Sequence, residues 1–547
     1  MNRISIASLA VVVLAIGCAE PKARPESAAN VNAGGQGTEA ANAGAQAANA
    51  QAADGGVQAA NGQAVDASAA ANAQAADGGT GSAQGQQASA EAPLMAEQQF
   101  RVGRPPALAR EGAFEAPVPL ERKLKNGARL LLVPNHAVPL VAIQVRLLHG
   151  ADAEAIPKAG LASLVAEAAA EGTKKRTAEK LARDIDQLAA RINSFATLDS
   201  AGVQMNCLRE TLEACLALLA DVVAHPAFRA EDVERVRSLR LARLAQKQAS
   251  IGQLAQDEAR RLLYGEAHPW GQPGGGTPAS VQALTRADLA AHHAAWWVPN
   301  DAVISVSGDI EPDEATAQLE KAFASWKKKA LPKLALAAPK PTLRRFVSAV
   351  DKPSATQSQV WMVGPLVPAS HPDALALEIA NNVIGGVFTS RLNLNLRERL
   401  GISYGVFSNV QLAGTSGAFF AQGGIVAKST ATAAAEYEKE VAAFATGDLS
   451  DVELQRARDT FVRSLPSQFE TNDAVAGAMA NLVVSRLPLD HYRTLAARAK
   501  ALTRDEVSAA VKRHFKPDSW PVVIVGPLAG SRAELDALGF GAVEPRP

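Results

Sequence analysis

Two glutamates, Glu167 and Glu171, lie one helical turn apart within 159–171, a segment that the sequence predicts to be helical. Carboxylates at this spacing can share a metal ion, because residues four apart lie on the same side of a helix. Neither glutamate has a histidine nearby, however, and zinc and similar metals prefer imidazole or thiolate ligands. We therefore interpret the pair as a solvated helix face and expect the chain to bind no metal cofactor of its own.

The histidines and a glycine run offer no better site. His292 and His293 are neighbours on a predicted helix, so their side chains cannot face one point together. His225 and His268 each precede a proline and are interpreted as turn residues. The run 274–276 is all glycine, but it lacks the Lys-Ser/Thr of a phosphate-binding loop and lies between two prolines. It predicts a plain loop.

A second pair of polar side chains, Arg397 and Tyr404, is separated by seven residues. Gly401 predicts the end of a helix and Ile402 the start of a strand, so the two side chains are expected to converge across the turn. A guanidinium and a phenol can hold a peptide carbonyl and stabilise developing negative charge. On residue types alone, the simpler interpretation is that Arg397 pairs with a surface carboxylate and Tyr404 packs at the strand start.

The elements that would position these residues occur twice along the chain. Each copy predicts a helix opened by threonine, then an aromatic residue, a proline turn and a β-rich run that ends in glycine. The globular part is therefore expected to be a duplication. The matching positions, each displaced by 218 residues, are Leu284-Thr285-Arg286 and Leu502-Thr503-Arg504, Pro299 and Pro517, and Gly308 and Gly526.

These patterns predict an α+β fold of two homologous halves. The N-terminal half is expected over 107–327 and the C-terminal half over 344–547, joined by a Lys- and Pro-rich linker over 328–343.

Local signals in the N-terminal half predict its first elements. Asn126-Gly127 predicts a hairpin with a type I′ turn, followed by strands over 130–133 and 141–147. One helix is expected from about Ala159 to Glu171, with Gly172 as its stop. A second helix is expected from Ala178 to about Arg191.

Composition excludes some classes of function. The 547 residues carry 55 basic and 55 acidic side chains, so no basic field favours nucleic-acid binding. After Cys18, only two cysteines remain. Cys207 is expected near a strand end and Cys215 inside a helix, so two buried thiols are predicted rather than a disulfide.

The first eighteen residues predict an export signal, because Arg3 precedes an apolar run too short to span a bilayer. Residues 15–18 resemble a bacterial lipobox, with Ala15 where leucine is usual and Cys18 as the lipidation site. This implies an exported lipoprotein of a Gram-negative bacterium, periplasmic or anchored to the outer membrane. An ordinary secretory signal is the alternative. Residues 19–106, rich in Ala, Gly, Gln and Asn, predict a disordered tether.

Many short segments, in one order, resemble the insulinase and pitrilysin family of zinc peptidases, and most closely its bacterial and mitochondrial-processing branch. The resemblance covers most of 107–540 and implies two α/β-roll halves. The segments are Pro134-Asn135-His136, Gly150, Gly160-Leu161-Ala162, Glu171-Gly172-Thr173, residues 193–199, His225-Pro226, His268-Pro269-Trp270-Gly271 and residues 299–309.

The family's catalytic motif, H-x-x-E-H, binds zinc through two histidines, and its glutamate activates the zinc-bound water; a distal glutamate completes the ligands. In this chain the two histidine positions are Ser163 and Glu167, the general-base position is Ala166, and the distal position is Arg243. The resemblance therefore implies a chain that has lost its catalytic residues.

The resemblance also implies what is retained. Arg397 and Tyr404 match a family pair that contacts substrate. Asn193 matches a weaker feature, an asparagine on an edge strand that holds the substrate as an added strand; a turn asparagine is the alternative.

Together these matches imply a non-catalytic, substrate-positioning subunit of an exported metallopeptidase, which is inactive alone. Its expected partners are a zinc-bearing subunit of the same family, peptide substrates and, through Cys18, a membrane. The alternative is a structural family member with no role in proteolysis.

Overall fold

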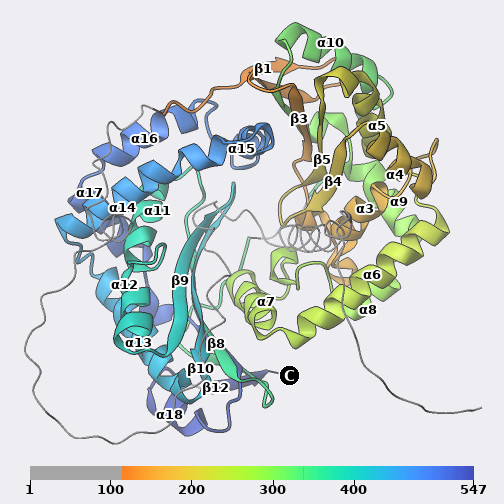
Figure 1. Ribbon diagram of the computed structural model, residues 1–547. Helices are drawn as coiled ribbons and strands as arrows, with labels where there is room; N and C mark the ends of the chain where they lie inside the picture. Colours follow the sequence, from red (N-terminus) through yellow and green to blue (C-terminus); the bar gives the residue numbers. More distant parts are fainter. Residues whose placement is uncertain (1–113, 335, 337, 542, 547) are drawn as a thin grey trace, which may run out of the picture. The chain divides into compact units, whose positions relative to one another are not determined.

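The computed structural model describes residues 114–547 except 335, 337, 542 and 547 (Figure 1). The predicted signal over 1–18, its Cys18 and the tether over 19–106 lie outside the described residues. Among the described helices, none is both long and apolar enough to cross a membrane.

Each half is built on a six-stranded mixed sheet. The strand order is β1-β2-β6-β3-β5-β4 in the N-terminal half and β12-β7-β11-β8-β10-β9 in the C-terminal half. In each sheet the third strand is parallel to the second and antiparallel to the fourth. Five strands of each sheet therefore share one topology, which confirms the predicted duplication; the sixth differs, since β1 is antiparallel to its neighbour and β12 is parallel. The strands are β1 (Leu120–Lys123), β2 (Arg129–Pro134), β3 (Leu140–Leu147), β4 (Arg191–Ala196), β5 (Ala201–Leu208), β6 (Ala302–Gly308), β7 (Val347–Asp351), β8 (Gln357–Leu366), β9 (Ser403–Leu412), β10 (Gly417–Val426), β11 (Val522–Gly526) and β12 (Val543–Arg546).

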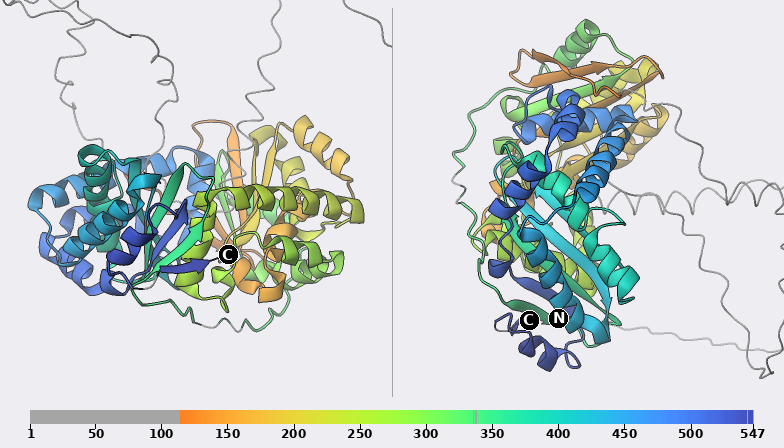
Figure 2. Two further views of the ribbon diagram at one scale, coloured as in Figure 1. Left: turned by 90° about the horizontal axis from the view of Figure 1, so that it is seen from below. Right: turned by 90° about the vertical axis from the view of Figure 1, so that its left-hand side faces the viewer.

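The helices of each half lie beside its sheet, as Figure 2 shows from two further directions. The longer helices of the N-terminal half are α3 (Leu161–Ala169), α4 (Ala178–Gln187), α5 (Leu212–Ala224), α6 (Ala230–Ala249), α7 (Ile251–Tyr264), α9 (Arg286–Trp296) and α10 (Pro312–Ala322). Those of the C-terminal half are α11 (Ala374–Ile384), α13 (Thr430–Ala445), α14 (Asp451–Ser464), α15 (Asn472–Val484), α16 (His491–Ala501) and α17 (Arg504–His514). The shorter helices are α8 (Pro278–Ala283), α12 (Arg391–Asn393), the π-helical η6 (Leu394–Arg399) and α18 (Arg532–Ala537).

The repeated threonines cap equivalent helices in the same way. At α9, the Thr285 hydroxyl accepts the N–H of Asp288, whose carboxylate accepts the N–H of Thr285. Thr503 and Glu506 form the same reciprocal capping box at α17. A cap of this kind stabilises a helix by about 1 kcal/mol. The repeat seen in the sequence therefore has a local physical basis.

One helix of each half packs against the sheet of the other half. Helix α15 contacts β3 and β6, where the Ser305 hydroxyl donates to the carbonyl of Ala476 over 2.7 Å. Helix α7 contacts β8 and β11, and its buried Ala255 and Leu262 share a core cluster with Val523. Burying an aliphatic side chain such as Leu262 contributes about 2 kcal/mol. The described parts of the two halves therefore share apolar core as well as topology.

The first hairpin forms as predicted, but its turn type was predicted wrongly. The connection between β1 and β2 spans five residues, 124–128, and within it only Gly127 has a positive φ, of 98°. A type I′ turn needs positive φ at both central residues. Here the Asn126 side-chain oxygen instead accepts the N–H of Ala128 at 3.2 Å.

Two helices are shorter than predicted. Helix α3 starts at Leu161 because Gly160 is left-handed, with a φ of 92°, and it ends at Ala169, before Gly172. Helix α4 ends at Gln187 rather than near Arg191. Ala189 adopts a φ of 49°, which interrupts the helix, and Arg191 already begins β4.

The cysteines lie as predicted. Cys207 belongs to β5 and Cys215 to α5, and both are buried and free.

Candidate functional site

Two positions of the degenerate zinc motif form an ion pair with each other. Glu167 on α3 and Arg243 on α6 are 76 residues apart in the sequence, yet Arg243 Nη1 lies 2.6 Å from Glu167 Oε1. Arg240, one turn earlier on α6, donates to the same oxygen over 2.7 Å. Two guanidinium groups therefore surround the carboxylate, and a cation at this point would be repelled by both.

The other two motif positions offer no ligand or base in place of the family's residues. Ser163 is half-buried on α3, and Ala166 is buried with 1% of its surface exposed. Ala166 has no group that could accept a proton, and a serine hydroxyl is a poor zinc ligand beside imidazole or carboxylate.

A second carboxylate, that of Glu154, accepts hydrogen bonds from the backbone at the start of α3. Glu154 accepts the N–H groups of Gly160 at 2.9 Å and Ala162 at 2.6 Å. Burial raises the pKa of Glu154 to about 7, while the charge of nearby Arg240 acts in the opposite direction. Sequence reasoning missed both residues. Arg240 could have been suspected from its spacing to Arg243, but Glu154 lies in an irregular segment with no such signal.

Glu171 is likewise occupied by an arginine, because Arg235 Nη2 lies 2.5 Å from its carboxylate. Glu167 and Glu171 therefore do not converge on a shared cation: each faces a guanidinium on α6.

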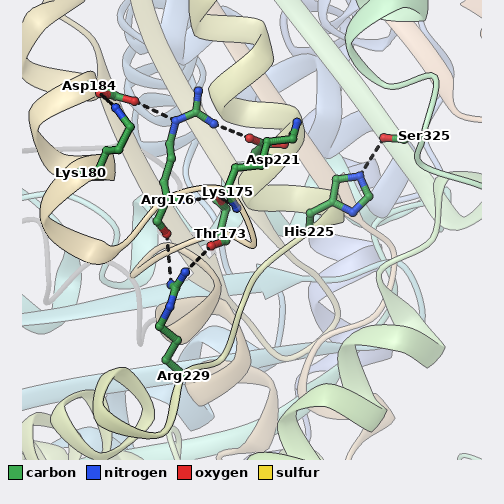
Figure 3. A network of polar contacts seen from close by, with 9 residues as sticks. All are labelled: Thr173, Lys175, Arg176, Lys180, Asp184, Asp221, His225, Arg229 and Ser325. Atoms are coloured by element: carbon green, nitrogen blue, oxygen red, sulfur yellow. Dashed lines mark hydrogen bonds and ion pairs between the residues drawn. The ribbon is translucent and has the colours of Figure 1, made fainter.

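A polar network holds the chain after α3 against its neighbouring helices (Figure 3). Arg176 pairs with Asp184 of α4 over 2.8 Å and with buried Asp221 of α5. Arg229, immediately before α6, donates to the carbonyls of Thr173 and Arg176 at 2.9 and 3.1 Å. These contacts fix the start of α6 relative to the end of α3, and so help to align the guanidinium groups with Glu167.

The other histidines and the glycine run lie as predicted. The His225 ring lies 2.8 Å from the Ser325 hydroxyl (Figure 3), and His268 Nδ1 accepts the N–H of Trp270 in a tight turn. His293 pairs with the carbonyl of Val223 at 2.9 Å. Residues 274–276 form a loop whose Gly274 carbonyl accepts from a lysine side chain.

The C-terminal pair lies on the predicted helix, glycine turn and strand. Arg397 is on η6, Gly401 has a φ of 64°, and Tyr404 is the second residue of β9. Arg397 pairs with Glu398 at 2.7 Å and lies over the Phe388 ring, 4.3 Å from its centroid. Tyr404 is 88% exposed. Among the described contacts none joins Arg397 to Tyr404, so the predicted convergence of the two side chains is not confirmed; the Arg397 side chain is 35% exposed.

Exposed aromatic side chains lie beside Arg397. Phe388 and Phe407 are 50% and 38% exposed, and their ring centroids are 6.0 Å apart. We define the aromatic patch as Phe388, Arg397 and Phe407. Exposed clusters of large side chains are typical of binding surfaces. Sequence reasoning missed this contact, because it did not single out Phe388, nine residues before Arg397.

The two equivalent edge strands differ in what their outer edges contact. The outer edge of β9 is occupied, since Ser408 N–H donates to the carbonyl of Gly385 at 2.8 Å and Val406 N–H to the Asn393 side chain at 3.1 Å. The strand β4 carries exposed Asn193, which pairs with Gln204 of β5 on the inner side. No hydrogen bond within the described part of the chain occupies the outer edge of β4, so this edge can accept another strand.

Two protein-family descriptions match the chain. The description "Insulinase (Peptidase family M16)" matches residues 129–265, and "Peptidase M16 inactive domain" matches residues 283–461, together more than half of the chain.

A Bacillus subtilis relative, "Uncharacterized zinc protease YmxG", is 23% identical over 406 residues, 74% of this chain and 97% of the relative. A Helicobacter pylori relative, "Non-peptidase homolog YmxG", is 25% identical over 401 residues, 72% of this chain and 90% of the relative. The crystal structure of a peptidase M16 inactive domain from Pseudomonas fluorescens has the same fold, with a TM-score of 0.70 and 23% identity over 78% of this chain and 100% of that one.

The family matches, together with the arginines that surround Glu167, lead to one conclusion: the chain belongs to the insulinase family, peptidase family M16, as a non-catalytic member.

Proposed function

We propose that this chain is the substrate-positioning subunit of a zinc metallopeptidase, and that a partner chain of the same family carries the zinc. The observation that carries the proposal is a contrast within one molecule. Glu167 is paired with two arginines, whereas Arg397 belongs to the exposed aromatic patch and Tyr404 is 88% exposed. If the chain served only as a scaffold, that role alone would not require this exposed patch.

Arg397 and Tyr404 would bind a peptide rather than cleave it. A guanidinium presents several N–H donors in a fixed plane, and a phenol presents one O–H, so both can donate to peptide carbonyl oxygens. Phe388 holds the Arg397 guanidinium by a cation–π contact, which limits the freedom that binding would otherwise remove. The ion pair with Glu398 is solvent-exposed and easily exchanged for a substrate contact.

The edge strand β4 would supply a second contact with the peptide. An extended peptide can add to an open sheet edge through main-chain hydrogen bonds, with side chains such as Asn193 fixing its register. The occupied edge of β9 makes β4 the better candidate of the two equivalent strands.

The cellular setting is part of the proposal. The apolar segment before Cys18 supports export, and the lipobox-like residues support a lipid anchor on the outer membrane or in the periplasm. The long Ala- and Gly-rich segment would then separate the two halves from the membrane surface.

A purely structural role is the second candidate, and the pairing of Arg397 with Glu398 favours it. In that case the aromatic patch would serve assembly with other proteins, and no peptide would be cleaved in its presence.

The decisive experiment reconstitutes the chain with a family member that retains H-x-x-E-H, ideally one encoded beside it. We expect little cleavage of fluorogenic peptides by either chain alone and strong cleavage by the complex. Arg397→Ala should lower kcat/KM without preventing assembly. The matched control is Arg399→Ala, which removes the same charge from the same helix, where Arg399 contacts Asn395 and Glu436. A complex that cleaves at full rate with Arg397→Ala would remove the role assigned to Arg397, whereas a complex that cleaves no faster than the zinc-bearing chain alone would support the structural alternative.

A further inference from the structure

Three potential metal ligands meet where α11 and α17 pack together in the C-terminal half. His371 lies in the loop before α11, Asp373 is the residue that immediately precedes α11, and His514 is the last residue of α17. One ring nitrogen of each histidine and one carboxylate oxygen of Asp373 all lie within 4.8 Å of one another. Asp373 and His514 are 141 residues apart in the sequence, so no local sequence motif predicts this cluster.

The geometry is close to that of a metal site. His514 Nε2 lies 2.7 Å from Asp373 Oδ2, and His371 Nδ1 lies 4.0 Å from the same oxygen. Tetrahedral zinc needs ligand atoms about 3.3 Å apart, given metal–ligand distances near 2.0 Å. The first pair must therefore open, and the second close, by less than 1 Å. The two imidazole planes meet at 87°, so the rings do not block one another.

The Asp373 carboxylate does not cap the helix that follows it. Asp373 occupies the N-cap position of α11, where aspartate normally accepts a helix N–H, yet its side chain makes no such bond. It points instead to His514 and Arg513. The side chains of His371, Asp373 and His514 are only 34%, 18% and 16% exposed, so the cluster is a partly enclosed site.

Two contacts would have to be exchanged on binding. Arg513 contacts the Asp373 carboxylate, and His371 Nδ1 accepts the N–H of Asp373 at 3.1 Å. The Arg513 side chain is 58% exposed, so it can move into solvent. The charge that it supplies to the carboxylate would then be replaced by that of the metal ion.

We propose that His371, Asp373 and His514 bind one divalent transition-metal ion of the zinc class. Two imidazoles and a carboxylate form a three-ligand set that zinc accepts, with water in the fourth position. The ion would join the start of α11 to the end of α17 and stabilise the C-terminal half. This site is separate from the degenerate zinc motif and departs from the expectation that the chain binds no metal of its own.

The test titrates zinc chloride into the metal-free full chain by calorimetry. We expect one zinc per chain, at least about tenfold weaker binding in His371→Ala and in His514→Ala, and a zinc-dependent rise in Tm that both variants lose. Arg513→Gln should bind zinc more tightly than the wild type, because a competing cation has been removed. A gain of affinity in Arg513→Gln cannot come from misfolding.

His136→Ala is the matched control, because His136 is an exposed histidine with two neighbouring carboxylates but no second imidazole. It should bind zinc as the wild type does, and so should Glu167→Ala. The proposal is overturned if the wild type binds no zinc, if His371→Ala and His514→Ala bind as tightly as the wild type, or if His136→Ala weakens binding equally. Loss of zinc in Glu167→Ala alone would place the metal at the degenerate motif and overturn the proposed function as well.

Discussion

Glu167 and Arg243 form an ion pair, 2.6 Å between Oε1 and Nη1, that joins α3 to α6 at two positions of the lost zinc motif. The pair brings opposite charges together without a metal. Arg240, whose side chain is 5% exposed, pairs with the same carboxylate from the protein interior. The two arginines differ in burial, and this difference makes the arrangement testable.

Arg240→Ala should destabilise the protein by about 1 to 3 kcal/mol, because the carboxylate of Glu167 loses its buried partner but keeps Arg243. Arg243→Ala should cost less than about 1 kcal/mol, since the Arg243 side chain is 50% exposed and solvent can replace it. Urea unfolding of both variants measures the difference. Equal costs for the two variants would show that burial of the pair does not matter.

Zinc binding at the motif should require more than restoring the family ligands. The buried guanidinium of Arg240 would remain beside the metal and oppose it. We therefore expect a variant that also carries Arg240→Leu to bind zinc more tightly than the one with the four restored positions alone. The comparison is made by calorimetry in a His514→Ala background, which removes the second proposed site. The restoring changes are Ser163→His, Ala166→Glu, Glu167→His and Arg243→Glu.

If the four-position variant binds zinc as tightly as the one that also carries Arg240→Leu, Arg240 is not the obstacle.

Glu154 should make the protein less stable as the pH rises. Its pKa is about 7 in the folded protein and about 4.5 when unfolded, so the native state holds the proton longer. Its stabilising contribution is full below pH 4.5 and is lost as the pH rises through 7. In Glu154→Gln this titration is absent, so the free energy of unfolding relative to wild type should rise between pH 4.5 and 7, by on the order of 3 kcal/mol.

Chemical denaturation at a series of pH values measures that difference, and effects of other titrating groups cancel because both proteins share them. A difference that stays constant with pH would contradict the raised pKa.

Tyr404→Phe should leave the Tm unchanged, because an 88% exposed side chain contributes little to packing. In the reconstituted complex it should lower kcat/KM by about fivefold if the hydroxyl donates to substrate, since a lost hydrogen bond costs on the order of 1 kcal/mol. Phe407→Leu, three residues along β9, keeps an apolar side chain and serves as the control. An unchanged kcat/KM in Tyr404→Phe would remove the hydroxyl from the proposal.

Asn193→Ala should raise KM several-fold while kcat stays the same, because a register contact on β4 binds ground state and transition state alike. Steady-state kinetics of the complex separate the two parameters. Ser194→Ala on the same strand is the matched control. A change confined to kcat would point to a different role for Asn193.

Local chemistry let the sequence predict much of the framework. Thr285 and Thr503 cap helices through residues only three positions away, so their repetition was visible without any tertiary contact. The loss of the two histidines was also visible in the sequence, because Ser163 and Glu167 occupy the positions where the family motif has histidine. The turn at Asn126 was predicted wrongly, since its side chain bonded locally to Ala128 rather than forming the tighter turn.

The sequence by itself determined the duplication, the α+β class and the loss of the catalytic ligands, because each follows from residue types and their order along the chain and needs no tertiary contact. Only the tertiary structure decided that Arg240 would reach Glu167, that β9 would have its outer edge occupied while β4 would not, and that His371 would meet His514. Each of these contacts joins different secondary-structure elements. Packing of whole helices and strands selects such contacts, and no local pattern encodes them.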